Sequence, residues 1–326
     1  MPPRSPDLGD VLVVTVRKSF WASPEADRFR ARVHVPVLFG HSTNLANAVV
    51  GFARALLVVL RRRPRVLFLG SVERMVPWFI RARRWGLLGR SRVIVTNQLH
   101  LDDEQLREVD RNVVYSQAWI ETQSQHVRAR AVFVPLPADG DFVAAAADAH
   151  DGDYVFAGGG TGRDFPTLIE ALRGTDVPLR IVTFSGATLG WPGELPDNVH
   201  VEWAMPPASF LERIASARVV VVPLRDPRSD FGQTTVVQAL SLGKPVVTTR
   251  SPGVVDYVRD GSEGFLVDAG DAAGYRAAVL RLCEDDELRR ACGVRALKRA
   301  RGSSYASFAD RMEKLCRELL EEGDRG

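Results

Sequence analysis

Cysteines and long apolar runs are scarce in this chain of 326 residues. Its three cysteines, Cys283, Cys292 and Cys316, lack metal-binding spacing and cannot all pair with one another, which predicts a reducing, cytoplasmic location. The longest mainly apolar stretch, residues 46–60, contains Arg54 and falls short of the roughly 20 residues that cross a bilayer. The N-terminus shows no basic segment followed by an apolar stretch of signal length. The chain contains 27 Gly, 19 Pro and 45% hydrophobic residues, a composition that excludes collagen, a coiled coil and an intrinsically disordered protein.

Charge is spread unevenly along the chain. The net charge of +3 combines a basic first half with an acidic second half, and residues 49–92 hold eleven arginines against one acid, Glu73. Tryptophan and leucine lie among these arginines, which would suit peripheral contact with an anionic membrane or an acidic acceptor. The alternative is that Arg61–Arg63 and Arg81–Arg84 are solvated helix ends. Nucleic-acid binding is not expected, because no nucleic-acid-binding motif accompanies the charge.

Apolar runs of three to seven residues alternate with amphipathic helical patterns along the whole chain. Such alternation predicts an α/β protein with parallel sheets covered on both faces. A stretch rich in Pro, Ala, Asp and Gly at 135–153 reads as a linker between two such domains. We therefore expect two doubly wound, Rossmann-like domains, at 1–138 and 153–303, with a cleft between them, and a final amphipathic helix within 304–326.

A glycine-rich turn follows the first strand of the second domain. Residues 154–165 read YVFAGGGTGRDF, which predicts a strand, a turn containing Gly158, Gly159 and Gly160, and a helix opened by Arg163. Glycines allow a phosphate to approach the backbone, and a helix N-terminus attracts anions. Arg163 would add a bidentate donor. The alternative is a tight turn in which Arg163 pairs with Asp164 or another neighbour.

A nicotinamide dinucleotide site is the obvious rival. Its G-x-G-x-x-G spacing would require glycine at Arg163, and the ribose-binding acid expected after the next strand, 179–183, is missing. This disfavours a dehydrogenase.

A second cluster lies at 223–245, which reads PLRDPRSDFGQTTVVQALSLGKP. It predicts a loop and then a helix from Gly232 to Leu242, whose first turn offers free N–H groups to an anion. That first turn contains Gln233, Thr234 and Thr235. Asp230 and Gln238 lie eight residues apart, about two helical turns, and could bind hydroxyl groups on two parts of one elongated ligand. The alternative is that Asp230 only caps the helix.

These residues carry a resemblance to a known family. The second cluster and the segment after it resemble the C-terminal half of retaining glycosyltransferases of family 4 (group 1). The matching pattern is an acid, Phe-Gly, Thr-Thr, Gln-Ala-Leu and LGKPVV, followed by PGVVDYVRDGSEGFLV. The resemblance is good over 153–300 and weak over 1–140. It implies the GT-B fold, with two Rossmann-like domains of which the second binds a nucleotide-sugar.

The resemblance also assigns roles in the second domain. Asp230 stands where the family has a Glu that touches the transferred sugar, and Gln238 where a second Glu holds the ribose. Arg163 stands at the position of the phosphate-binding basic residue. Residues 251–256 match a donor-site loop in which Gly-x-x-Glu is usual and Gly253–Asp256 stands here. Because both glutamates are replaced, the sequence keeps open a weakened donor site or a silent relative.

In such an enzyme the first domain supplies the acceptor side, often with a histidine. His100 follows the strand at 92–96 and is the candidate near the reacting bond; His41, before a helix expected from Thr43, is an acceptor-side candidate. Asp102 and its acidic neighbours look like a helix N-terminus. We expect no metal and no cofactor, so that Arg163 and helix N-termini neutralise the diphosphate.

The sequence thus predicts a glycosyltransferase that moves a sugar from a nucleoside-diphosphate sugar to an acceptor hydroxyl, and the resemblance implies retention of configuration. The alternative from another class is a catalytically silent GT-B protein that binds or regulates a partner transferase. A nucleotide-sugar epimerase of the same fold is more distant.

Overall fold

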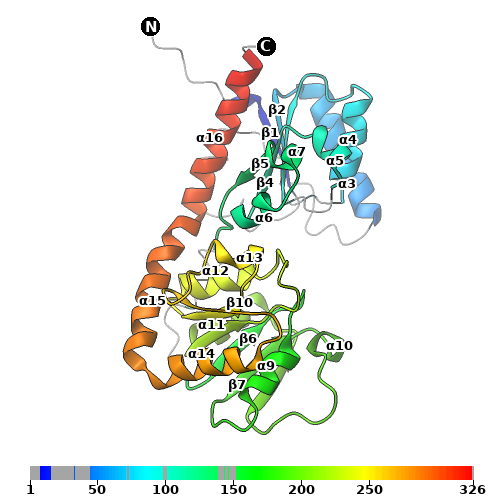
Figure 1. Cartoon of the computed structure of the whole chain (residues 1–326). Coiled ribbons are helices and arrows are strands. Elements are labelled where there is room, and N and C mark those ends of the chain that lie inside the picture. The colour runs from blue at the N-terminus through cyan, green and yellow to red at the C-terminus, as the bar shows by residue number, and fades with distance from the viewer. Residues whose placement is uncertain are drawn as a thin grey trace. The chain divides into compact units, whose positions relative to one another are not determined.

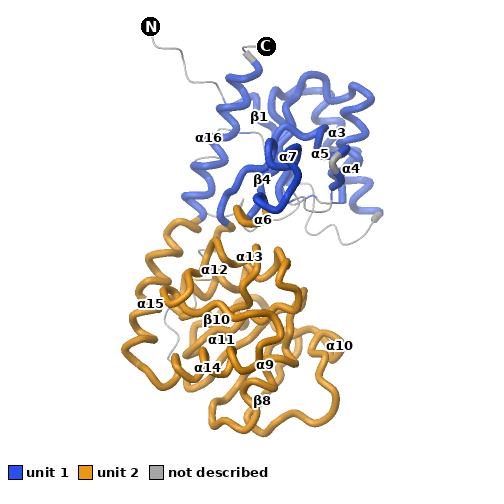
Figure 2. The backbone as a smooth tube through the Cα atoms, in the orientation of Figure 1, with its two compact units in different colours: residues 1–115, 120–135, 305–326 blue, residues 116–119, 136–304 orange. Residues whose placement is uncertain are grey.

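The computed structural model describes residues 8–15, 33, 45–70, 72, 74–97, 101–138, 143, 146 and 152–324. The chain divides into two compact units, drawn in different colours in Figure 2. Unit 1 comprises residues 1–115, 120–135 and 305–326, and unit 2 comprises residues 116–119 and 136–304. From the sequence, the final helix within 304–326 is predicted as a segment separate from the two domains. In the structure, residues 305–326 form part of unit 1.

Unit 1 is built on a five-stranded parallel sheet in the order β1-β2-β3-β4-β5. Every residue of its first two strands is buried, as expected for a parallel sheet covered on both faces. The strands are β1 (Val11–Thr15), β2 (Val66–Gly70), β3 (Arg92–Thr96), β4 (Arg111–Val114) and β5 (Ala131–Phe133).

Helices from distant parts of the chain cover the two faces of this sheet (Figure 1). Helices α3 (Leu45–Arg62) and α4 (Val76–Arg84) pack on one face. Neighbouring parallel strands joined by right-handed crossovers put their connecting helices on the same side, so the other face needs a different cover. Helix α16 (Tyr305–Asp324) supplies it with an apolar side that includes Met312 and Leu319. The short helices are η1 (Leu8–Asp10), α5 (Asp103–Arg107), α6 (Gln117–Glu121) and α7 (Gln125–Arg128).

Unit 2 is built on a six-stranded parallel sheet in the order β11-β10-β9-β6-β7-β8. The chain runs outward from β6 in one direction and then returns to add β9 on the other side. The strand order therefore reverses between β6 and β9, and ligands of open α/β sheets bind beyond the carboxyl ends of strands at such a point. The strands are β6 (Val155–Gly158), β7 (Leu179–Thr183), β8 (Val199–Trp203), β9 (Val219–Val222), β10 (Val246–Thr249) and β11 (Gly264–Val267).

Helices cover both faces of the second sheet as well. The longer ones are α11 (Pro207–Ala215) and α12 (Gln233–Ser241) on one face, and α9 (Phe165–Leu172) and α14 (Ala272–Glu284) on the other. The remaining elements are α10 (Gly186–Leu189), α13 (Pro252–Val255), α15 (Asp286–Ala300) and η2 (Arg301–Ser303).

The apolar runs predict strands at 92–96, 179–183 and 32–38, among others, and the first two are confirmed as β3 and β7. The helix expected from Gly232 to Leu242 is α12 with these two residues as its caps, and the final helix is α16. Of the strand predicted at 32–38, only Val33 is described. The pattern of apolar residues predicts these elements because the inner strands are buried on both faces, which gives continuous apolar runs, whereas the helices are buried on one face only.

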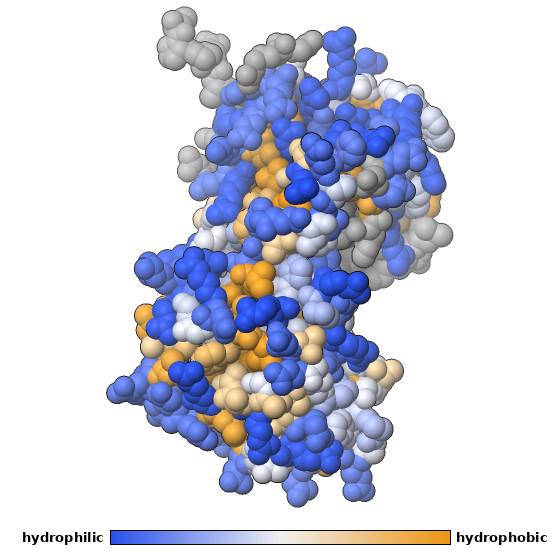
Figure 3. Space-filling view, viewed as in Figure 1, coloured by the Kyte–Doolittle hydropathy of each residue, from blue (hydrophilic) through white to orange (hydrophobic). Residues whose placement is uncertain are grey.

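The surface view in Figure 3 is largely hydrophilic, with apolar side chains showing beside α16 and over the middle of unit 2. Among the described residues, no helix has the length and apolar character needed to cross a bilayer. All three cysteines are buried and free, and burial raises the pKa of Cys316 to about 12.

Candidate functional site

Both sequence motifs of unit 2 begin at the reversal point of its sheet. The glycine-rich turn follows β6, and the loop 223–232 follows β9, the strand paired with β6. Two backbone hydrogen bonds join the motifs: Asp164 N donates to Pro223 O (3.0 Å), and Arg225 N donates to Gly162 O (2.9 Å). Tertiary structure therefore brings together segments that lie about 60 residues apart in the sequence.

The glycines of the turn lie close to side chains of the protein itself. A Cβ atom at Gly158 would lie 2.6 Å from the ring of Phe210, and one at Gly160 would lie 2.6 Å from the ring of Phe184. Gly159 has a φ of 110° and lies against the Arg163 guanidinium, where a Cβ would be 2.8 Å from Nη2. Packing at Gly158 and the positive φ of Gly159 therefore account for two of these glycines without a phosphate, which removes part of the sequence argument for an anion site.

The side chain of Arg163 lies inside this turn. The residue is only 7% exposed, and its guanidinium donates to Gly158 O (2.9 Å), Thr161 O (3.2 Å) and Thr235 Oγ1 (3.2 Å). All three partners are neutral, and within the described part of the chain Arg163 forms no ion pair. Burial lowers its pKa to about 10, which still leaves it charged at pH 7. Of five N–H donors, one on Nη1 and one on Nη2 keep no partner among the described residues.

The helix after the turn begins later than the sequence suggested. Arg163 does not open it: α9 starts at Phe165, and Asp164 is its N-cap. The Asp164 carboxylate accepts hydrogen bonds from Thr167 N (3.4 Å) and Thr167 Oγ1 (2.7 Å). Pro166, in the first turn, has no N–H to offer. The N-terminus of α9, proposed from the sequence as an anion site, is therefore occupied by a carboxylate of the protein itself.

Helix α12 begins differently. Its N-cap is Gly232 at a φ of 99°, which provides no side-chain cap, and its first turn contains no acid. Thr234 is exposed there, whereas Thr235 is buried and receives the hydrogen bond from Arg163. The positive end of this helix and the buried guanidinium thus lie together, and both favour a bound anion.

Asp230 lies in the loop before α12 and does not cap it, because Gly232 holds the N-cap position. The side chain of Gln233 donates to the backbone carbonyl of Asp230. The loop 251–256 packs directly on this segment: Gly253 N donates to Ser229 O (2.9 Å), and a Cβ at Gly253 would lie 2.6 Å from the carbonyl carbon of Asp230. The two donor-site loops implied by the resemblance are thus in contact.

Three buried polar atoms have no hydrogen-bond partner among the described residues: Gln238 Oε1 on α12, Ser251 Oγ after β10 and Thr183 Oγ1 at the end of β7. An unpaired buried polar atom is costly, so each is a candidate contact for a bound ligand. Gln238 was proposed from the sequence; Thr183 and Ser251 were not. A hydroxyl at or just after the carboxyl end of a buried strand is the signal that would have marked them.

Asp256 serves a structural purpose. Its carboxylate accepts hydrogen bonds from Ser116 Oγ (3.0 Å) and Ala118 N (3.1 Å), and its backbone carbonyl accepts one from Arg299. This acid, which stands at the Glu of the family's Gly-x-x-Glu, therefore holds residues 116–119 in unit 2.

The histidine candidates of the first half lie outside the described residues. Neither His100 nor His41 is among them, so their roles stay predictions. Asp102, near His100, is confirmed as part of a helix N-terminus: it caps α5 and forms a capping box with Gln105. The described residues include no group of three His, Cys, Asp or Glu that could hold a metal ion.

Comparison with known proteins identifies relatives of part of the chain. Residues 193–299 match the family model described as Glycosyl transferases group 1, a segment that includes Asp230 and Gln238 but not the glycine-rich turn. D-inositol 3-phosphate glycosyltransferase of Corynebacterium kroppenstedtii is 32% identical over 118 residues, which are 36% of this chain and 26% of that protein. N-acetyl-alpha-D-glucosaminyl L-malate synthase of Bacillus anthracis is 28% identical over 124 residues, 37% of this chain and 31% of that protein. These matches thus span about a quarter to a third of the relatives' length.

Solved structures resemble the whole chain. A glycosyltransferase from Rickettsia africae gives a TM-score of 0.67 at 12% identity and covers 95% of this chain and 98% of its own. Sucrose-phosphate synthase from Thermosynechococcus elongatus gives a TM-score of 0.67 at 15% identity and covers 96% of this chain and 99% of its own. HepE from Anabaena, solved with UDP and glucose, gives a TM-score of 0.64 at 13% identity and covers 94% of this chain and 98% of its own. The chain has the GT-B fold predicted from its sequence, with two Rossmann-like domains.

Proposed function

We propose that the protein is a glycosyltransferase that moves a sugar from a nucleoside-diphosphate sugar to an acceptor hydroxyl, with retention of configuration. The observation that carries this proposal is the buried charge of Arg163, whose described partners are all neutral. Buried charges are ordinarily paired, because an unpaired one loses several kcal/mol of hydration free energy. A diphosphate at the start of α12 would supply the missing negative charge.

The comparisons support this choice of ligand. The matched segment 193–299 falls in a family of glycosyl transferases, and HepE, which shares the fold, was solved with UDP and glucose. The exposed start of α12 and the unpaired Gln238 Oε1 add the two further contacts that a nucleoside diphosphate needs, one for phosphate and one for a ribose hydroxyl. Asp230, at the position of the family's first glutamate, would orient the transferred sugar.

In the proposed reaction the oxygen of the acceptor hydroxyl bonds to the anomeric carbon on the face from which the diphosphate departs, and the bond from that carbon to the diphosphate oxygen breaks. The proton of the acceptor hydroxyl passes to the departing diphosphate. Negative charge builds up on the leaving phosphate. The Arg163 guanidinium and the N–H groups of Gln233, Thr234 and Thr235 would stabilise this charge. His100, with His41 on the acceptor side, is the proposed group of the first domain nearest the reacting bond.

Thermal unfolding with UDP, GDP and dTDP, each at about 1 mM, tests the donor site, and NAD serves as the control. A ligand held at about 100 times its Kd stabilises the folded state by about 2.7 kcal/mol, which shifts Tm by several degrees. We expect one diphosphate to raise Tm and NAD to leave it unchanged. The absence of a shift with all three diphosphates would contradict the proposal.

Incubation with the matching nucleotide-sugar then separates an enzyme from a silent binding protein. Release of the nucleoside diphosphate with transfer of the sugar, with the anomeric configuration read by proton NMR, supports the enzyme. A Tm shift without turnover on any hydroxyl acceptor would instead favour the catalytically silent GT-B protein that the replacement of both family glutamates leaves open.

A further inference from the structure

Helix α3 of unit 1 is apolar on two opposite sides, although it packs on the sheet with only one. Its inner side includes Ala48, Ala55 and Val59, which are all at most 1% exposed. Its outer side exposes four large apolar residues to between 43% and 50%: Val49, Val50, Leu57 and Leu60. At about 100° per residue these four fall within an arc of roughly 100°, so they form one continuous stripe. Packing within unit 1 explains the inner side only.

The end of the neighbouring helix α4 continues this apolar surface. Helices α3 and α4 are packed together through Phe52, whose ring lies 5.5 Å from Trp78 and 4.9 Å from Phe79, centroid to centroid. The turn after α4 exposes Trp85 to 75% and Leu87 to 39%. A hollow of about 710 Å³ lies between the end of α3 and this turn, with Leu60 and Leu87 among its apolar residues.

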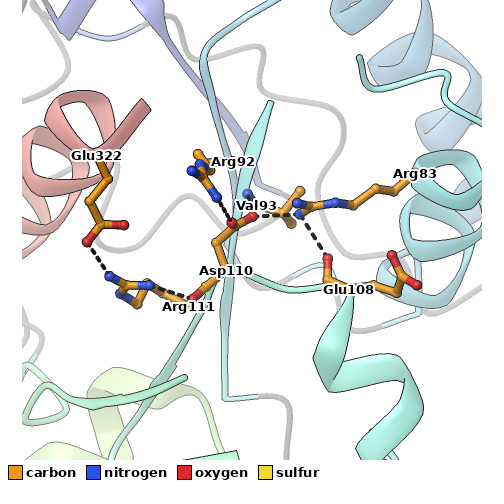
Figure 4. A network of polar contacts seen from close by, with 7 residues as sticks. All are labelled: Arg83, Arg92, Val93, Glu108, Asp110, Arg111 and Glu322. Atoms are coloured by element: carbon orange, nitrogen blue, oxygen red, sulfur yellow. Dashed lines mark hydrogen bonds and ion pairs between the residues drawn. The ribbon is translucent and has the colours of Figure 1, made fainter. Parts of the chain in front are cut away.

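Among the arginines of residues 49–92, two groups can be distinguished in the structure, which together include eight of the eleven. One group is paired with acids: the Asp110 carboxylate accepts hydrogen bonds from Arg83 (2.6 Å), Arg92 (2.9 Å) and Val93 N (2.8 Å), as Figure 4 shows. Burial by itself would raise the pKa of Asp110, but these hydrogen bonds outweigh it and hold the pKa below its usual value. Arg84 pairs with Glu104 and Glu108. This group stabilises unit 1.

The second group has no such partners. The side chains of Arg61, Arg62, Arg63, Arg81 and Arg90 are exposed and form no ion pair or hydrogen bond with any residue that the structure describes. Three of them follow one another at the end of α3, beside Leu60, and Arg63 and Arg90 both line the hollow. Unpaired positive charge thus borders the exposed apolar stripe.

We infer that this surface, formed by the outer side of α3 and the turn 85–90, binds peripherally to a lipid bilayer that contains anionic phospholipids. The valines and leucines of the stripe would enter the boundary between headgroups and acyl chains, Trp85 would lie at the interface, and the unpaired arginines would contact lipid phosphates. A helix surface that combines exposed aliphatic residues, tryptophan and arginine is the type that lies in the plane of an anionic membrane. Nucleic acid would match the charge but leave the aliphatic stripe exposed to water.

Vesicle co-sedimentation tests the inference without relying on the donor site. Vesicles of phosphatidylcholine with about one third phosphatidylglycerol are compared with vesicles of phosphatidylcholine alone. Each basic residue near an anionic surface should raise the partition coefficient about fivefold. We expect binding to the anionic vesicles, weak binding to the neutral ones, and release as salt is raised. Equal binding to both vesicle types, or to neither, would overturn the inference.

Two sets of variants separate this surface from positive charge in general. Arg61→Gln, Arg62→Gln and Arg90→Gln together should lower partitioning onto anionic vesicles about a hundredfold. The control, Arg290→Gln, Lys298→Gln and Arg301→Gln, removes the same charge from exposed positions of unit 2 and should change partitioning much less. Arg63 is left in place because its φ of 48° makes a substitution ambiguous for folding.

The apolar contribution is tested with Leu57→Ser and Trp85→Ser together. Both side chains are exposed, so Tm should hold, while vesicle partitioning should fall at least about tenfold because buried apolar area contributes to interfacial binding. Unchanged partitioning of this double variant, or equal loss in the arginine set and its control, would overturn the inference. Binding to a DNA duplex at the same salt, as tight as to vesicles and equally insensitive to Leu57 and Trp85, would identify a general polyanion surface instead.

Discussion

Two helices of unit 2, α9 and α12, begin at the carboxyl edge of the same sheet after the paired strands β6 and β9. From the sequence both look like anion sites. In the structure, Asp164 caps α9 and Pro166 removes one N–H from its first turn, whereas α12 starts at Gly232 with neither a side-chain cap nor an acid. The difference shows that a helix N-terminus is available to a ligand only where the protein leaves it uncapped.

Arg163 belongs to the first motif by sequence but contacts both motifs. It donates to Gly158 O and Thr161 O of the glycine-rich turn, and its Nη2 donates to Thr235 at the start of α12. The guanidinium therefore joins the glycine-rich turn to the open start of α12. Arg163 therefore remains a candidate phosphate-binding residue, although the prediction that it lies in the first turn of α9 is wrong.

The largest expected effect follows from removing that charge. Arg163→Met keeps most of the side-chain volume and should lower the rate of sugar transfer by about 10²–10³, because it removes a preorganised donor for the leaving diphosphate. The Tm shift with the nucleoside diphosphate should disappear, as measured by thermal unfolding. Transfer at the original rate in a folded variant would exclude Arg163 from the donor site.

Making α12 resemble α9 should have the next largest effect. Thr234→Glu places an acid in the exposed first turn of α12, where it should stabilise the free protein by about 0.3–1 kcal/mol. The same carboxylate should repel a diphosphate and lower its affinity about tenfold in calorimetric titration. Ala273→Glu, in the first turn of α14, is the matched control and should leave the affinity unchanged. An unchanged affinity for Thr234→Glu would contradict an anion site at α12.

Gln238 should show opposite effects on stability and binding. Gln238→Met removes a buried oxygen that lacks a described partner, so the free protein should keep its Tm or gain slightly. Affinity for the nucleoside diphosphate should fall several-fold, because a ribose hydroxyl loses its acceptor. Gln238→Glu should instead raise the affinity several-fold, since charge-assisted hydrogen bonds are about twice as strong as neutral ones. Parallel changes in Tm and affinity would point to a role in packing only.

The smallest effect concerns the capped helix. Asp164→Ala removes the N-cap of α9 and should destabilise the protein by about 1 kcal/mol in urea unfolding. Affinity for the diphosphate should stay within about twofold, because the proposed diphosphate site lies at the start of α12 and not at α9. A large gain in affinity would mean that the N-terminus of α9 is a second anion site that Asp164 normally blocks.

Several local features could be predicted from the sequence. Gly232 and Gly243, with φ of 99° and 68°, mark both ends of α12 through the backbone preference of glycine, and Asp102 and Gln105 form a recognisable capping box on α5. The start of α9 was missed because Arg163 precedes an Asp-Phe-Pro sequence in which the acid, as the N-cap, and not the arginine defines the boundary. Thr183 and Ser251 lie at or just after the carboxyl end of a strand, which the sequence could have indicated, but only the tertiary structure shows that their hydroxyls are buried without a partner among the described residues.

The basic segment 49–92 is a second case in which the sequence identifies candidate residues but not their contacts. Sequence alone counts eleven arginines, and it singles out Arg81–Arg84 as readily as Arg61–Arg63. Only the fold shows that Arg83 and Arg92 share the carboxylate of Asp110 while Arg61–Arg63 have no described partner. The arginines suited to a membrane surface are therefore a subset that composition could not identify.

The α/β class, the two parallel sheets and the two motifs follow from local sequence, because strand burial, helix amphipathicity and glycine preference act over a few neighbouring residues. The three-dimensional fold sets which helix N-terminus stays open, where the Arg163 charge lies, which arginines are neutralised and that α16 completes unit 1. Those outcomes depend on contacts between residues tens to hundreds of positions apart, such as Arg163 with Thr235 and Arg111 with Glu322. Pairing of this kind is fixed by packing in three dimensions, and local sequence preferences do not encode it.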